Sequence, residues 1–300
     1  MNHQLSSVKY LAIEQLLARQ LWATLQLYIF DRSVLTGLKS PPLKRIQQQQ
    51  RVLYVSAIAL QLSSVLKLPA LDIAYALAEL VCHQTDGQDF TVQVVPPAWI
   101  YLELTESYLA AWLQHLTQAP PELEPREPRE LREPRELGRK SNPKSKIELS
   151  LFAVQYAHAR CCSLLQLAHR EELISLKPTN SAHSSALWLA VTPLPIPWLN
   201  DEQKLCLCHS GEWGLIDRLW AILDELYCPY PSRQPPNWHK AALSLSQAFQ
   251  TFYSYCRIWG EVKSQNLPLA QARLGLVLIT QSVLRLLLQS KLGVVAPSEV

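Results

Sequence analysis

The chain has 300 residues, of which 48% are hydrophobic and 18% charged, a balance that fits a folded protein and excludes an intrinsically disordered one. Its seven cysteines lack the spacing of a disulfide framework and indicate reduced thiols and a cytoplasmic location. The net charge of +3 is small for a dedicated nucleic-acid-binding protein, because phosphate neutralisation usually requires a clear basic excess.

Residues 1–117 are expected to form one domain that is mostly helical with some extended structure. Apolar residues at three- to five-residue spacings predict an amphipathic helix over residues 5–29. Similar patterns predict a second helix over residues 51–66, ended before Pro69, and a third over residues 70–82.

Strand-forming residues interrupt this helical pattern further along the same domain. Valine, threonine and isoleucine lie on both sides of Pro96 and Pro97 and predict two short strands within residues 90–104. Residues 108–116 return to helical spacing. The first domain is therefore expected to be a small α+β domain.

Residues 118–146 read QAPPELEPREPRELREPRELGRKSNPKSK. Proline every few residues forbids a regular helix, and alternating charges keep the segment solvated. We interpret it as a disordered charged linker that tethers the first domain to a second one, residues 147–300.

The second domain is expected to be an all-helical bundle. Apolar stripes predict helices over residues 149–168, 215–227 and 238–259. A last helix is predicted to open with Asn266 as its cap and Pro268 in its first turn, and to end near Gly293. The fold class is then mainly α.

Two apolar features of this domain could be mistaken for membrane or docking segments. The last helix carries Arg273, Gln281 and Arg285, so we expect no membrane span. The proline- and tryptophan-rich stretch WLAVTPLPIPWL lies in an irregular loop over residues 177–200. Its apolar part, which starts at Leu187 and ends at Leu199, either packs on its own bundle or contacts a protein partner.

The second domain resembles the anticodon-binding helical bundle of arginyl-tRNA synthetases, the DALR domain. VQYAHARCCSLLQLA at residues 154–168 is similar to the opening helix of that family, with seven consecutive matches in VQYAHAR. SQAFQTFYSYCRIWG at residues 246–260 and the tail ARLGLVLITQSVLRLLLQSKLGVVAPSEV are similar to two later runs. The resemblance covers nearly all of residues 147–300.

The first domain more weakly resembles the N-terminal domain of the same enzymes, which contacts the elbow of tRNA. Residues 51–81 are similar to its helix pair, and VVPPAWIYLELTESYLAAWL at residues 94–113 is similar to its G-P-G-F-I-N-F run and following helix. The asparagine of that run, part of the elbow contact, is replaced here by Tyr101.

The resemblance implies tRNA as a partner and a set of binding residues. Splayed anticodon bases stack on aromatic or guanidinium planes. Tyr156 and Tyr253 match tyrosines that the family presents near the anticodon loop, while Arg160, Arg257 and Lys263 are candidates for phosphate contacts. The alternative for the tyrosines is packing between helices, with hydroxyl groups bonded at the rim.

No catalytic residue, metal site or cofactor is expected. In the family a catalytic domain with H-I-G-H and K-M-S-K-S motifs separates the two matched regions, whereas here His209 is followed by Ser-Gly-Glu and no H-x-G-H run occurs. Cys206, Cys208 and His209 lack a second ligand pair at zinc spacing. His158 is expected to be a buried, hydrogen-bonded residue rather than a catalytic one.

Three functions remain open. The first is a non-catalytic, synthetase-like protein that binds the anticodon stem-loop of a tRNA. The second is a protein-interaction scaffold that has lost tRNA binding, favoured by the small net charge and by Tyr101. The third is an accessory chain that assists a separate catalytic protein in arginyl-tRNA aminoacylation.

Overall fold

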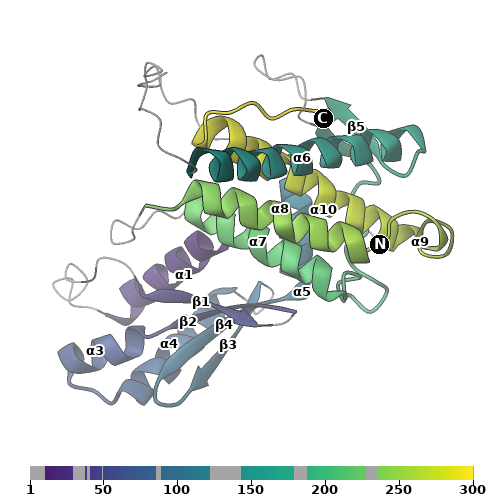
Figure 1. Ribbon diagram of the computed structural model, residues 1–300. Helices are drawn as coiled ribbons and strands as arrows, with labels where there is room; N and C mark the ends of the chain where they lie inside the picture. The colour runs from purple at the N-terminus through teal and green to yellow at the C-terminus, as the bar shows by residue number, and fades with distance from the viewer. Residues whose placement is uncertain are drawn as a thin grey trace. The chain divides into compact units, whose positions relative to one another are not determined.

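The computed structural model describes residues 11–29, 38, 41–48, 50–85, 89–121, 143–178, 188–227 and 235–299. The helices and strands follow in chain order: α1 (Ile13–Tyr28), β1 (Leu43–Gln48), β2 (Arg51–Ser56), α3 (Ile58–Leu66), α4 (Ala70–Thr85), β3 (Phe90–Val95), β4 (Trp99–Leu104), α5 (Glu106–Gln118), α6 (Pro143–Arg170), β5 (Ser175–Pro178), β6 (Trp188–Thr192), α7 (Ser210–Tyr227), α8 (Trp238–Tyr255), α9 (Glu261–Gln265), α10 (Leu267–Leu286) and the π-helical turn η1 (Leu287–Lys291) (Figure 1). The mainly helical fold class is confirmed.

The chain divides into two compact units, each built from discontinuous segments. The N-terminal unit comprises Met1–Trp112, Trp198–Trp213 and Trp220–Arg233, and the C-terminal unit comprises Leu113–Pro197, Gly214–Leu219 and Gln234–Val300. Helices α5 and α7 therefore contribute residues to both units. The expected boundaries at residues 117 and 146 stay a prediction, because residues 122–142 lie outside the described part of the chain.

The N-terminal unit contains an antiparallel sheet in the order β1-β2-β4-β3. Strand β4 alternates between half-buried and buried positions, with Ile100, Leu102 and Leu104 on the buried face. Helices α3 and α4 pack on this sheet, and α1 packs against α4 (Figure 1). The two strands expected around Pro96–Pro97 are confirmed as β3 and β4.

The helix expected over residues 51–66 is wrong in its first part. Residues 51–56 form β2, an inner strand of the sheet, and only Ile58–Leu66 is helical. Val52, Tyr54 and Val55 are all buried. A strand covered on both faces reads as a continuous apolar run, which periodicity alone does not separate from a buried helix.

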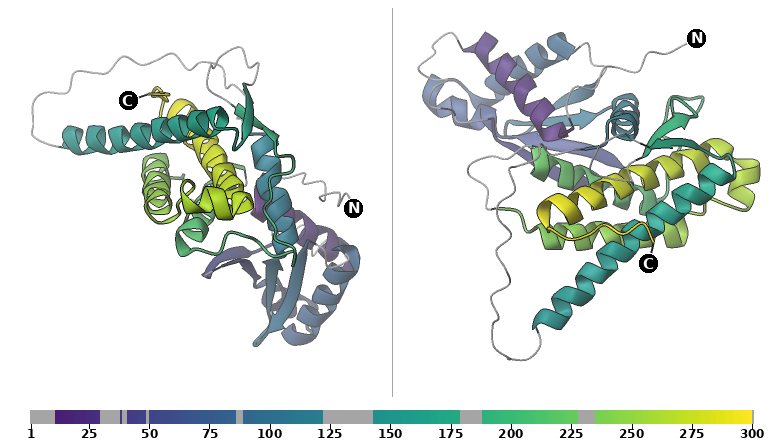
Figure 2. Two further views of the ribbon diagram at one scale, coloured as in Figure 1. Left: turned by 90° about the vertical axis from the view of Figure 1, so that its right-hand side faces the viewer. Right: turned by 90° about the horizontal axis from the view of Figure 1, so that it is seen from above.

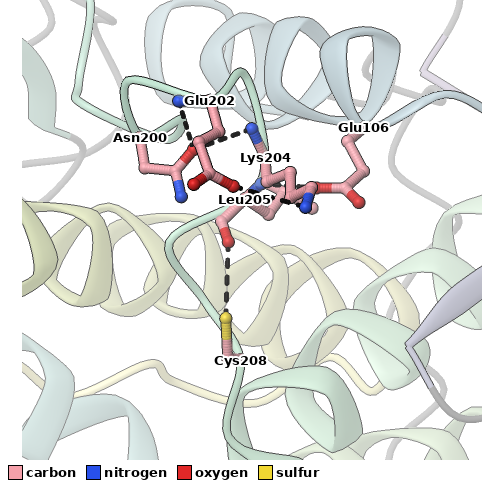
Figure 3. A network of polar contacts seen from close by, with 6 residues as sticks. All are labelled: Glu106, Asn200, Glu202, Lys204, Leu205 and Cys208. Carbon is pink, nitrogen blue, oxygen red and sulfur yellow. Dashed lines mark hydrogen bonds and ion pairs between the residues drawn. The ribbon is translucent and has the colours of Figure 1, made fainter.

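A loop completes the N-terminal unit by binding to the first turn of α5 (Figure 3). The carboxylate of Glu106 accepts a hydrogen bond from the Leu205 backbone N–H at 2.5 Å. Within the loop the Asn200 side-chain oxygen accepts from the backbone N–H groups of Glu202 and Lys204 at 3.0 and 2.9 Å. These bonds fix a tight turn with Leu205 buried beneath it.

The C-terminal unit is organised around α10, which packs against α6 and α8 (Figure 2). Asn266 accepts a hydrogen bond from the Leu269 backbone N–H at 3.1 Å and so caps α10, as expected. Apart from Gln271, every residue of the helix from Ala270 onward is buried.

Among the described residues, the stretch Leu267–Lys291 passes by length and composition as a possible membrane span. However, 78% of the apolar window lies buried inside the protein. Arg273 and Arg285, each 8% exposed, lie on the same helix. The burial indicates a core helix.

Three further expectations for the second domain need correction. Residues 175–178 and 188–192 pair as the antiparallel strands β5 and β6, where an irregular loop and an all-helical bundle were expected. Helix α8 ends at Tyr255 and not at residue 259. Phe152 lies on the apolar stripe that predicted the helix over residues 149–168, but its side chain is 54% exposed and lies outside the core.

Candidate functional site

The candidate site lies on α6 of the C-terminal unit. One face of this helix is buried, and the residues that line it are Val154, Ala157, His158, Cys161, Cys162, Leu165 and Ala168. Phe152, Tyr156 and Arg160 follow one another at intervals of four residues, so they lie in a row on a different face of the helix. The helical spacing thus separates core residues from residues that can meet a ligand.

The first two members of this row are a pair of exposed aromatic rings. Phe152 and Tyr156 are 54% and 47% exposed, and their ring centroids lie 6.4 Å apart in a stacked arrangement. Exposed aromatic planes offer stacking positions for unpaired bases. The alternative expectation that Tyr156 packs between helices does not fit its exposure.

Arg160 and Tyr253 are brought together from α6 and α8. The Arg160 guanidinium donates a hydrogen bond to the Tyr253 hydroxyl at 2.5 Å, and its Cζ lies 5.0 Å from the Tyr253 ring centroid. Tyr253 is 37% exposed and stacks on Phe249 with centroids 6.2 Å apart. A guanidinium has five N–H groups, so the one bond to Tyr253 leaves donors that can reach a phosphate.

The other two predicted site residues, Lys263 and Arg257, make contacts with residues outside this aromatic group. Lys263 on α9 forms an ion pair with Glu171, just beyond the end of α6, at 2.8 Å, and the Trp259 indole donates to the same carboxylate at 2.9 Å. The hydrogen bond from Lys263 holds the pKa of Glu171 below its usual value. Arg257 has an exposed position after α8, and its backbone carbonyl accepts a hydrogen bond from Arg273.

His158 lies on the buried face of α6, one turn after Val154, and is fully buried, as expected. Its Nδ1 lies 2.7 Å from the Pro297 carbonyl oxygen and its Nε2 lies 3.0 Å from the Gln281 amide nitrogen. Because a carbonyl only accepts, Nδ1 carries the proton and Nε2 accepts from Gln281. Burial lowers the pKa of His158, and the charge of Arg285 lowers it further against the opposing effect of the Pro297 bond.

The chain end is held along α6 by two side chains that flank Tyr156 in the sequence. Gln155 donates to the Val295 carbonyl at 2.8 Å, and His158 binds the Pro297 carbonyl. The yellow tail runs beside the helix in Figure 1. The sequence did not indicate which residues hold the tail, because these contacts join positions about 140 residues apart.

The cysteine-histidine run of the N-terminal unit has structural roles. His209 Nδ1 accepts from the Gly211 backbone N–H at 3.0 Å, and Glu212 accepts from the His209 backbone N–H at 2.8 Å, which together cap α7. The Cys208 thiol faces the Leu205 carbonyl at 3.5 Å (Figure 3). Within the described ranges, no group of three or more His, Cys, Asp or Glu side chains is arranged to hold a metal ion.

Comparison with known proteins covers the half of the chain that carries this site. Residues 154–300 match the model of the DALR anticodon binding domain. The chain is 38% identical over 144 residues to an arginine–tRNA ligase of Synechococcus sp. (strain JA-3-3Ab), a match that covers 48% of this chain and 21% of the relative.

Two further relatives show the same pattern. An arginine–tRNA ligase of Heliobacterium modesticaldum is 31% identical over 150 residues, covering 50% of this chain and 23% of the relative. One of Gloeobacter violaceus is 34% identical over 146 residues, covering 46% and 20%. The chain thus spans about a fifth of the length of the curated relatives it matches.

No solved structure matches the chain. The family match begins at Val154, so the resemblance of residues 51–81 and 94–113 to the N-terminal domain of the synthetases stays a prediction. Residues 154–300 match the DALR anticodon binding domain family, and over about half of its length the chain is similar to arginine–tRNA ligases.

Proposed function

We propose that the C-terminal unit binds the anticodon stem-loop of a tRNA and that the 300 residues do not catalyse aminoacylation by themselves. The observation that carries the proposal is the group formed by Tyr156, Arg160 and Tyr253, in which two partly exposed tyrosines accompany a guanidinium. Phe152 extends this group by one helical turn. The four residues offer stacking planes and a cation within one surface.

Stacking supplies the affinity that the small net charge does not. Base–aromatic stacking contributes about 1–3 kcal/mol per base. The net charge of +3 and the engagement of Lys263 by Glu171 leave few cations for phosphate. We therefore expect modest affinity with a shallow dependence on salt, because the salt slope counts the phosphates that are neutralised.

The non-catalytic part of the proposal rests on what the sequence contains between its two halves. The resemblance of both halves to the synthetases implies that residues 118–146 replace the nucleotide-handling domain of that family, and no H-x-G-H run occurs in the 300 residues. An assay of arginine attachment with the purified chain, ATP and total tRNA tests this part. Arginine attachment above background by the chain alone would contradict the non-catalytic part of the proposal. The cytoplasmic location stays a prediction.

The binding part is tested by fluorescence anisotropy with a labelled anticodon stem-loop. Tyr156→Ala and Arg160→Ala should each weaken binding about five- to tenfold, which corresponds to about 1–1.4 kcal/mol. Tyr75→Ala, which removes an exposed tyrosine (58%) from the N-terminal unit, is the matched control and should leave the affinity unchanged. Equal affinities for the wild type and the three variants would show that Tyr156 and Arg160 do not contribute to binding.

A second candidate is a protein-interaction scaffold that uses the stretch from Leu187 to Leu199. Val191 and Leu194 in this stretch are 45% and 56% exposed, whereas Ile196 and Trp198 are buried, and Leu187 lies outside the described residues. Affinity capture with and without ribonuclease discriminates the two functions, because a protein partner held by this stretch survives digestion. Loss of that partner in Leu194→Asp assigns the contact to the stretch.

The accessory function in arginyl-tRNA aminoacylation is the third candidate. It is compatible with anticodon binding, since a chain that holds the anticodon leaves the acceptor end to another protein. Arginine attachment by a separate arginyl-tRNA synthetase, measured with and without added chain, tests it. A rate that does not change with added chain contradicts it.

A further inference from the structure

A buried carboxylate ties α7 to the N-terminal unit. Asp224 is 3% exposed, and its Oδ1 accepts a hydrogen bond from the Glu14 backbone N–H at 3.0 Å. Its Oδ2 accepts from the hydroxyl of Tyr54, which is fully buried on β2. One carboxylate thus joins α7 to α1 and to the inner strand of the sheet.

Trp220, one turn before Asp224, makes a second set of contacts. Its indole N–H donates to the Tyr54 hydroxyl, and the two rings meet edge to face with centroids 5.2 Å apart. The Arg45 guanidinium of β1 lies 4.9 Å from the Trp220 ring centroid. Two residues of α7 therefore contact α1, β1 and β2.

The loop before α7 adds further ties within the same unit. Besides the bond from Leu205 to Glu106 (Figure 3), the Gln50 side chain donates to the Cys208 carbonyl at 2.8 Å. Trp198, Leu205 and Leu207 are 2%, 4% and 0% exposed. These three apolar side chains anchor the loop in the core of the N-terminal unit, while residues 200–204 of the loop are exposed.

The C-terminal unit receives a segment in return. The end of α5 belongs to it, and Leu113 and Leu116 are 0% and 1% exposed there. The Gln114 side-chain oxygen accepts from the Ile196 backbone N–H at 2.8 Å. Each unit thus contains segments from both sides of residues 122–142.

We propose that this exchange of segments is a clasp, and that the clasp rather than the covalent linker keeps the two parts of the chain, residues 1–121 and 143–300, associated. The physical reason is that a buried polar group without its partner carries the full cost of its desolvation. Asp224, Tyr54 and Trp220 satisfy one another only while α7 is in place. Apolar side chains such as Leu207 and Leu116 would also return to water on separation.

The test cuts the linker of the folded, full-length protein. A site-specific protease sequence replaces part of residues 126–136, and the purified protein is cleaved and passed over a size-exclusion column with light-scattering detection. Both pieces should elute together at the mass of the uncut chain. Elution as two separate pieces in native buffer would overturn the proposal.

Clasp variants in the cut protein show which contacts hold the pieces. Tyr54→Phe removes one hydroxyl and leaves the packing, and Asp224→Ala removes the carboxylate. Each should raise the dissociation constant of the pieces at least tenfold, while Tyr75→Phe and Asp201→Asn, which alter exposed positions, should not change it. Tyr54→Phe remains informative if Asp224→Ala does not fold.

An unchanged dissociation constant in Tyr54→Phe would show that the hydrogen bonds among Asp224, Tyr54 and Trp220 do not hold the two pieces together, and would contradict the proposal. The experiment contains no RNA, so its outcome is independent of the proposed anticodon binding.

Discussion

Each unit buries one ionisable side chain, and burial shifts the two pKa values in opposite directions. In the N-terminal unit, burial raises the pKa of Asp224 to about 6 against hydrogen bonds from Tyr54 and Glu14 that lower it. In the C-terminal unit, burial lowers the pKa of His158. The same physical cause, loss of solvation of the charged form, therefore makes the acid weaker and the base weaker.

The partners of the two groups also differ, and so does the expected role. Asp224 accepts hydrogen bonds from Glu14 on α1 and Tyr54 on β2, and both of these residues are buried. His158 faces a chain end whose Val295 is 73% exposed. The comparison therefore sets a contact enclosed in the core of the N-terminal unit against a buried histidine in the C-terminal unit that binds a partly exposed segment.

The largest expected effect is that of Asp224→Ala on the whole chain. The change leaves the Tyr54 hydroxyl and the Glu14 N–H without their acceptor, and each such group costs about 1–3 kcal/mol. The free energy of unfolding, measured by urea denaturation, should fall by about 2–3 kcal/mol. A loss below about 0.5 kcal/mol, the usual effect of a surface substitution, would contradict a buried role for the carboxylate.

A smaller loss is expected for His158→Leu. Gln281 loses one of its acceptors, the His158 ring, but keeps the contact with the Cys162 sulfur, and the Pro297 carbonyl can bind water once the tail moves away. We expect a fall of about 1–2 kcal/mol in the free energy of unfolding. Limited proteolysis of residues 294–299 should also become faster than in the wild type, and an unchanged rate would show that His158 does not hold the tail.

The two groups should have opposite effects on the pH dependence of stability. The raised pKa of Asp224 means that the folded state binds the proton more tightly than the unfolded state, so the part of the stability that depends on this proton is lost as pH rises from about 4 to about 6. The hydrogen bonds that the carboxylate accepts from Tyr54 and Glu14 remain above that pH. The lowered pKa of His158 means that its contribution is lost as pH falls below about 6.5. Each slope is at most about 1.4 kcal/mol per pH unit.

Urea denaturation between pH 4 and pH 8 separates the two contributions. Asp224→Asn should remove a slope of one sign, and His158→Leu a slope of the other. Slopes of the same sign in the two difference curves would contradict the assignment.

Phe152→Ala should change RNA binding with little change in stability. The ring is 54% exposed and contacts Tyr156 by stacking, so its loss should cost less than about 0.5 kcal/mol of folding free energy. Affinity for the stem-loop should fall about fivefold, because one stacking position worth about 1 kcal/mol is removed while the cation stays. An unchanged affinity would confine the site to Tyr156, Arg160 and Tyr253.

The smallest effect is expected for Lys263→Ala. Its ion pair with Glu171 is exposed to solvent and screened by salt. Neither the unfolding midpoint nor the stem-loop affinity should change beyond the error of measurement. A marked loss of affinity for the stem-loop would show that Lys263 takes part in RNA binding.

The sequence predicted the parts of this fold that depend on local pattern. Helices α4, α5 and α10 follow from helical spacing, and the cap at Asn266 follows from its position before Pro268. Strand β2 was missed because its two buried faces remove the alternation that marks a strand. Strand β6 was missed because prolines follow it directly.

The parts of the site and of the core that depend on contacts between distant positions could not be predicted from the sequence. Tyr156, Arg160 and Tyr253 were named from the family motif, but only the packing of α6 against α8 brings Arg160 to Tyr253. The partners of Asp224 lie 170 and 210 positions away. In an amphipathic helix an aspartate reads as part of a solvated face, so no local signal marked it.

Base-resolved chemical probing of a full-length tRNA, with and without the protein, tests anticodon binding itself. The unpaired anticodon-loop bases should be protected by the protein, and this protection should be reduced in Tyr156→Ala. Protection confined to the acceptor stem or the elbow, or none at protein concentrations that saturate binding, would contradict it.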